Sequence, residues 1–129
     1  MDERVVVSAA VIRRGDEFLV TRRLKGTHLE GYWEFPGGKC EDGESHVQCL
    51  EREIREELDT GIRVGELILT TMHSYPGRVV ELHFFRCELD GDPRPAIGQE
   101  MRWVASSELG RLNFPPADSE LLDVLKSGR

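Results

Sequence analysis

The spacing of apolar residues changes character along the chain. Short runs rich in β-branched and aromatic residues predict strands over residues 5–12, 17–22, 64–74, 79–89 and 100–105. A turn at residues 13–16 connects the first two runs, which indicates a hairpin, and residues 75–78 join the two long central runs. A further aromatic segment over residues 32–35 ends at Pro36, Gly37 and Gly38.

The residues after this glycine pair change to helical spacing. Ser45 is a favourable N-cap, and Gln48 stands three residues later as its capping-box partner. The expected core-facing stripe consists of Val47, Leu50, Ile54 and Leu58. Residues 59–61 end this helix, and a second helix is expected over residues 117–126.

Three acids of the first helix, Glu53, Glu56 and Glu57, stand at positions i, i+3 and i+4, beside the apolar stripe. Like charges at this spacing destabilise a helix unless a positive charge lies among them. Hard divalent cations such as Mg²⁺ are held by a few carboxylates together with substrate phosphates. The pattern favours a metal site, and the alternative is a solvated face on which Arg52 and Arg55 pair with the acids.

Composition and charge narrow the class of protein. A chain of 129 residues is expected to form one domain over residues 1–129. The net charge of −7 argues against binding to polymeric nucleic acid, which needs a basic face, but leaves small anionic substrates open. Three cysteines without a CxxC pair predict neither a disulfide framework nor a zinc site, and favour the cytoplasm. The longest apolar run is too short to span a membrane.

The acids belong to a longer spaced pattern. Gly38 is followed after five residues by Glu44, and after seven more by the sequence REIREE of residues 52–57. This spacing closely resembles the signature of the Nudix hydrolases. Residues 21–23 (TRR), 34–39 (EFPGGK) and 114–117 (FPPA) resemble the MutT-type branch of that family. The resemblance implies an α/β fold, an α/β/α sandwich around a mixed β-sheet. It also implies Mg²⁺-dependent cleavage of a nucleoside diphosphate linked to a further group, with Mn²⁺ as a possible substitute.

The chain departs from the family signature at one place. The glycine that should follow the acids is replaced by Asp59, and Gly61 comes two residues late. A left-handed residue is common at a helix C-terminus, and Asp tolerates that conformation better than most residues. We therefore expect a shifted helix end and an intact site.

The resemblance also implies roles for individual residues. The implied metal ligands are the Gly38 carbonyl, Glu53, Glu56, Glu57 and, in a distal loop, Glu100. The implied catalytic residues are Glu53, Glu44 and Arg52, with the general base left open between Glu53 and Glu100. The implied substrate-binding residues are Arg23, Phe35, Arg78, Leu82, Phe114 and Asp118. Phe35, Leu82 and Phe114 could instead be core residues, and the two arginines could be solvated.

Asp118 bears on the nucleobase. In the 8-oxoguanine-selective bacterial enzyme of the MutT-type branch the corresponding residue is Asn, which offers a donor and an acceptor. An ionised Asp only accepts, which suits the amino group of cytosine or the N1–H and 2-amino donors of guanine. The segment resembles the MutT-like branch that acts on CTP, dCTP and 5-substituted cytosine nucleotides. Asp118 could also cap the last helix.

The sequence therefore predicts a MutT-type enzyme that cleaves (deoxy)nucleoside triphosphates to monophosphate and pyrophosphate in nucleotide-pool sanitation. Cytidine nucleotides and oxidised or modified nucleotides are the favoured substrates. The alternatives are a Nudix hydrolase of another substrate, such as ADP-ribose, and a non-catalytic nucleotide-sensing domain. The expected partner is a small nucleotide, without a membrane, in a monomer or homodimer, and the number of metal ions stays open.

Overall fold

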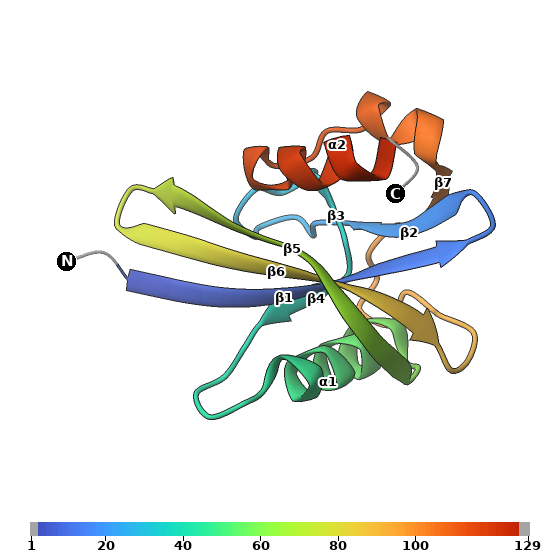
Figure 1. Ribbon diagram of the computed structural model, residues 1–129, viewed down its shortest axis with the longest axis horizontal. Coiled ribbons are helices and arrows are strands. Elements are labelled where there is room, and N and C mark those ends of the chain that lie inside the picture. Colours follow the sequence, from blue (N-terminus) through green and yellow to red (C-terminus); the bar gives the residue numbers. More distant parts are fainter. Residues whose placement is uncertain (1–2, 127–129) are drawn as a thin grey trace.

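A mixed β-sheet lies between two helical layers in the computed structural model, which describes residues 3–126 (Figure 1). The seven strands are β1 (Glu3–Arg14), β2 (Glu17–Arg22), β3 (Trp33–Glu34), β4 (Gly37–Lys39), β5 (Ile62–Tyr75), β6 (Arg78–Leu89) and β7 (Met101–Ala105). The helices are α1 (His46–Leu58) and α2 (Ser119–Lys126), with two 3₁₀ turns, η1 (Ser106–Arg111) and η2 (Pro116–Asp118). The expected α/β class with helices flanking a mixed sheet is confirmed. The extreme ends of the predicted domain lie outside the described residues.

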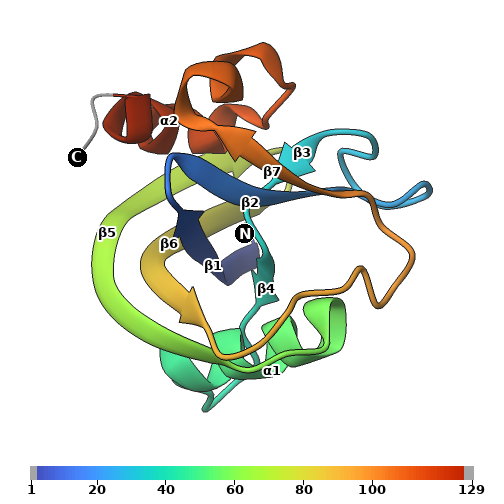
Figure 2. The ribbon, with the colours of Figure 1, turned by 90° about the vertical axis from the view of Figure 1, so that its right-hand side faces the viewer.

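Strand β1 is the centre of the sheet. It runs parallel to β6 along most of its length and antiparallel to β4 and β2, so that the main order is β3-β2-β1-β6-β5 (Figure 2). β7 extends the β2 end of the sheet, and β5 pairs with β6 to form a long hairpin at the other end. Within residues 3–126 no helix is long and apolar enough to cross a membrane.

The two faces of β1 serve two separate cores, because successive side chains on a strand point to opposite sides. Ala9 and Val11 belong to a cluster with Leu121 and Leu125 of α2. Ala10 and Ile12 belong to a second cluster, whose members from α1 are Leu50, Ile54 and Leu58. The sheet therefore has a face covered by α2 and a face covered by α1, as Figure 1 shows.

Helix α1 begins where the sequence predicted. Ser45 accepts a hydrogen bond from the Gln48 backbone N–H, and the Gln48 side chain accepts one from the Ser45 backbone. The expected stripe is wrong at one position, since 45% of Val47 is exposed. Val47 lies in the first turn, before the helix reaches the core cluster, and Cys49 is buried instead.

The end of α1 is not shifted. The last helical residue is Leu58, and Asp59 itself adopts the left-handed conformation with φ 54° and ψ 40°. The Asp59 backbone N–H donates to the Arg55 carbonyl, and its carboxylate pairs with Arg94. Asp59 therefore takes the conformation expected of the missing glycine, and the expectation of a displaced helix end was wrong.

Strand β4 was not expected from the sequence. Pro36, Gly37 and Gly38 were interpreted as a stop, yet Gly37–Lys39 pairs with β1. A Cβ atom at Gly37 would lie 2.1 Å from the Ser8 carbonyl oxygen, and φ there is +154°. The glycine is needed because it lets β4 approach β1 closely, which no propensity scale for strands anticipates.

Candidate active site

Two cavities meet beside β4. The first, which we call the acidic cavity, measures about 330 Å³ and lies between β2, β4 and the flank of α1. The second, the apolar cavity, measures about 290 Å³ and lies on the α2-facing side of β1 and β6. The residues that line both are Arg23, Glu34, Gly37, Gly38 and Lys39. An elongated ligand could therefore occupy both cavities at once.

The three helical acids line the acidic cavity together with Gly38. The side chain of Glu53 is largely buried, whereas 58% of the Glu56 side chain is exposed. A Cβ atom on Gly38 would lie 2.4 Å from the Glu53 carboxyl carbon, so an alanine there would displace the Glu53 carboxyl group. The sequence pattern thus brings Gly38 and the helical acids to one place.

Arg52 links Glu53, which lines the acidic cavity, to Glu44 outside it. Its guanidinium donates two hydrogen bonds to the Glu44 carboxylate, at 2.8 and 2.9 Å, and one to Glu53 at 2.8 Å. The hydrogen bonds from Arg52 lower the pKa of Glu44 to about 2. Arg52 also donates to the Lys39 carbonyl at 3.1 Å. This arrangement fixes Glu53 against the backbone of β4, because a bidentate guanidinium restricts orientation.

Glu57 has the most perturbed carboxyl of the cavity. Burial, followed by repulsion from Glu34 and Glu53, raises its pKa to about 8. Among residues 3–126, its Oε1 atom is buried without a hydrogen-bond partner. A carboxylate oxygen in that situation is destabilising unless a cation or a donor arrives.

These residues fit a divalent cation held partly by its substrate. Within residues 3–126 no group of three or more His, Cys, Asp or Glu side chains forms a ready metal cage. Mg²⁺ commonly takes one or two carboxylates and completes its coordination with phosphates and water. The partnerless Glu57 oxygen and the neighbouring Glu53 could supply those carboxylates.

In the distal loop, the expected residue Glu100 and its neighbour Gln99 lie in different surroundings. The Glu100 carboxylate is 58% exposed, pairs with Arg22 at 2.9 Å, and does not line either cavity. Its neighbour Gln99 is buried and lines the acidic cavity. The Gln99 amide donates to the Glu57 carbonyl at 2.9 Å, so it ties the loop to the end of α1.

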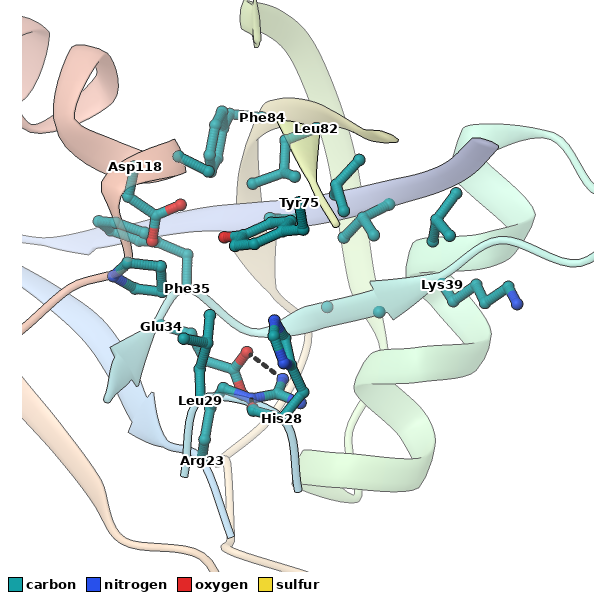
Figure 3. A pocket seen from close by; sticks show the side chains of 18 of the residues that line it. Arg23, His28, Leu29, Glu34, Phe35, Lys39, Tyr75, Leu82, Phe84 and Asp118 are labelled. Atoms are coloured by element: carbon teal, nitrogen blue, oxygen red, sulfur yellow. Dashed lines mark hydrogen bonds and ion pairs between the residues drawn. The ribbon is translucent and has the colours of Figure 1, made fainter. Parts of the chain in front are cut away.

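The apolar cavity ends at a buried acid, as Figure 3 shows. Asp118 is 4% exposed, and its carboxylate faces the cavity. Burial, and then repulsion from Glu34, raises its pKa to about 7. Phe35 and Leu82 line the walls, as the resemblance implied.

Phe114 lies behind this wall and not in it. Its ring stacks on Phe35 at 5.4 Å and packs against the α2-side core. The two expected cations, Arg23 and Arg78, both line the apolar cavity. Arg23 donates to Glu34 at 3.0 Å, where the two cavities join.

Several lining residues were given no role from the sequence, and four of them bear on the site. Glu34 lies between the cavities, Tyr75 lies over the apolar cavity, and Thr21 and Gln99 line the acidic one. Glu34 stood within the quoted EFPGGK segment, and Gln99 stood beside Glu100, so their positions offered a signal. Tyr75 stood at an ordinary turn and offered none.

Comparisons with known proteins agree with this geometry. The family model described as the NUDIX domain matches residues 8–124. The chain therefore belongs to the Nudix family, and it is a Nudix hydrolase of the MutT type. That family typically uses a divalent metal. The resemblance inferred from the spaced acids and glycine is confirmed.

Individual relatives cover almost the whole chain. An 8-oxo-dGTP diphosphatase from Haemophilus influenzae is 34% identical over 95% of this chain and 92% of its own. A CTP pyrophosphohydrolase from Escherichia coli is 33% identical over 97% of this chain and 93% of its own. The solution structure of the E. coli ORF135 protein is 32% identical and superposes with a TM-score of 0.86 over 99% of this chain and 94% of that one.

Proposed function

We propose that this Nudix hydrolase cleaves (deoxy)nucleoside triphosphates to the monophosphate and pyrophosphate, and that cytidine nucleotides are its preferred substrates. The observation that carries the choice of base is Asp118, a buried carboxyl at the end of a cavity with apolar walls. An ionised carboxyl accepts a hydrogen bond from the exocyclic amino group of cytosine. The relatives named for CTP and for 8-oxo-dGTP support the nucleotide class equally.

Each of the two cavities binds a different part of the substrate. The base enters the apolar cavity, and the phosphates lie where Arg23, Lys39 and Arg78 line it. Arginine forks and lysine ammonium groups are the usual partners of phosphate oxygens. The triphosphate thereby reaches the acidic cavity, which shares Arg23 and Lys39 with the apolar one.

The acids at that end perform the hydrolysis. A bound Mg²⁺ or Mn²⁺ supplies charge neutralisation of the phosphates and a more acidic water. Glu57 and Glu56, with the Gly38 carbonyl, would hold the cation, and Glu53 would either hold it or accept the proton of the attacking water. Arg52 keeps Glu53 and Glu44 in place through its three short hydrogen bonds. We leave Glu100 as a second candidate for the base, since its pair with Arg22 lies at the surface.

A second substrate class is favoured by the state of Asp118. Because its pKa is raised to about 7, the carboxyl is partly protonated near neutral pH. A protonated carboxyl donates and accepts, as Asn does, which suits the edge of an oxidised guanine. Both classes are consistent with a cytoplasmic single-domain enzyme that removes unwanted nucleotides from the pool.

A substrate panel tests this proposal. The protein is incubated with Mg²⁺ or Mn²⁺ and with CTP, dCTP, 8-oxo-dGTP, dGTP and ATP, and pyrophosphate and orthophosphate are measured separately. We expect pyrophosphate from all productive substrates and the highest kcat/KM for a cytosine or oxidised base. Failure of every nucleotide to yield pyrophosphate would refute the reaction class, and tight binding without turnover would favour a sensing domain.

A further inference from the structure

Two buried side-chain oxygens have no hydrogen-bond partner within residues 3–126, and both belong to residues that line the acidic cavity. They are Thr21 Oγ1 and Glu57 Oε1. Buried polar groups are nearly always paired, so each exception needs an explanation. A cation site explains the unpaired Glu57 oxygen, but it does not by itself explain the unpaired Thr21 hydroxyl.

The strand pattern directs Thr21 toward α1. Leu19 packs in the core cluster with the buried residues of α1, and Thr21 lies two positions further along β2, on the same face. Its paired neighbour on β3 is Glu34, which lines the acidic cavity too. Thr21 is 1% exposed, so its hydroxyl is enclosed between the sheet and the acidic flank of the helix.

Several polar groups that line the same cavity already make hydrogen bonds. The Glu34 carboxylate accepts from Arg23, and the Gln99 amide is engaged with the backbone of Glu57 and Ile97. The backbone of β2 is paired on both sides, with β3 and with β7. Thr21 Oγ1 and Glu57 Oε1 are therefore two buried oxygens that belong to residues lining one cavity and that lack a hydrogen-bond partner among residues 3–126.

We propose that Thr21 is a positioning residue for the Glu57 carboxylate, to which its hydroxyl donates a hydrogen bond, directly or through one water molecule, when Glu57 holds the divalent cation. The inference rests on the proposed function, because it needs a cation at Glu57. Carboxylate ligands are usually held by a further hydrogen bond, and losing that partner weakens metal affinity. This hydrogen bond would give the unpaired Thr21 hydroxyl a partner.

The competing explanation is ordinary strand packing, since threonine is common in strands. The two explanations differ in what an isosteric change does. Thr21→Val keeps the branched shape and removes the hydroxyl, and Thr21→Ser keeps the hydroxyl and removes a methyl group. Replacing an unpaired hydroxyl by an apolar group of the same shape should not destabilise the metal-free protein.

The test measures Mn²⁺ binding by electron paramagnetic resonance without nucleotide, and the thermal midpoint of the metal-free protein. For Thr21→Val we expect Mn²⁺ affinity to fall about ten- to a hundredfold, with a midpoint unchanged or higher. Thr21→Ser should stay within about threefold of the wild type, well inside the loss expected for a missing partner. Thr70→Val is the matched control, because Thr70 is exposed on β5 and its hydroxyl contacts His83 away from the site.

Wild-type affinity in Thr21→Val, or equal losses in the valine and serine variants, overturns the inference while leaving the proposed function intact. If the wild type itself fails to bind Mn²⁺, the metal site of the proposed function fails and this inference fails with it. Should Thr21→Val not fold, Thr21→Ala is measured in the same way, and the same two outcomes decide.

Discussion

Asp118→Asn should stabilise the protein at alkaline pH and leave its stability at acid pH nearly unchanged. Asp118 is buried at the end of the apolar cavity, and its pKa rises from an ordinary 3.8 to about 7. The unfolded chain releases the Asp118 proton near pH 4, whereas the folded protein keeps it up to about pH 7. The folded state therefore binds more protons across this window, and stability falls as the pH rises through it.

The size of the effect follows from the two pKa values. The rise in the pKa of Asp118 from 3.8 to about 7 corresponds to a loss of about 4 kcal/mol in the stability of the wild type. This loss is complete above about pH 7 and absent below about pH 4. Asparagine cannot ionise, so its variant escapes this loss. The gap in unfolding free energy between Asp118→Asn and the wild type should widen by about 2–4 kcal/mol between pH 4 and pH 8, after a discount for relaxation around the charge.

Urea unfolding at pH 4, 6 and 8 measures this gap. Asp123→Asn, an exposed position on α2, is the matched control and should show no pH-dependent gap. In the same proteins, kcat/KM for CTP relative to 8-oxo-dGTP should fall in Asp118→Asn, because the amide loses an acceptor oxygen and gains a donor. A gap that is constant across pH would show that Asp118 is not a buried ionisable group and would refute the reasoning about the base.

Variants at three further positions test the rest of the site and the end of α1. Gly38→Ala should lower kcat by about a hundredfold or more with a small change in stability, because its Cβ would lie 2.4 Å from the Glu53 carboxyl carbon. The control is Gly110→Ala, whose Cβ would meet the flexible Lys126 side chain. Normal turnover in Gly38→Ala would contradict the site geometry. Arg52→Lys should lower kcat roughly ten- to a hundredfold in steady-state assays, since a lysine cannot bridge Glu44 and Glu53 together; an unchanged kcat would remove Arg52 from the account. Asp59→Gly should raise the free energy of unfolding by up to about 1 kcal/mol, and Asp59→Val should lower it by about 1–2 kcal/mol, because φ at this position is +54°. Equal stabilities of the two variants in urea unfolding would contradict the left-handed helix end.

The sequence predicted the elements with strong local patterns. The capping box of α1 was correct because both of its partners lie within four residues, and β2 was correct to the residue. Val47 was misplaced because periodicity describes one helix and not the extent of the surface that covers it. Strand β4 was missed because its pairing depends on the close approach of Gly37 to a residue about thirty positions earlier.

The candidate site divides in the same way. The helical acids and Gly38 could be placed together because their spacing is local and specific. The hydrogen bond from Gln99 to the end of α1 could not be predicted, since it joins residues 42 positions apart. Glu34 stands within the EFPGGK segment that resembles the MutT-type branch, but its local sequence does not show that it lies where the two cavities join.

The central claim is that the acidic cavity holds the cation for cleavage of a nucleoside triphosphate to monophosphate and pyrophosphate. The most direct measurement quantifies CMP, pyrophosphate and orthophosphate formed from CTP with Mg²⁺ by the wild type and by Glu57→Gln, beside their unfolding curves. The account predicts equal amounts of CMP and pyrophosphate from the wild type, and a rate at least about a hundredfold lower in a variant that remains folded. Orthophosphate as the main product, or an undiminished rate in folded Glu57→Gln, would contradict it.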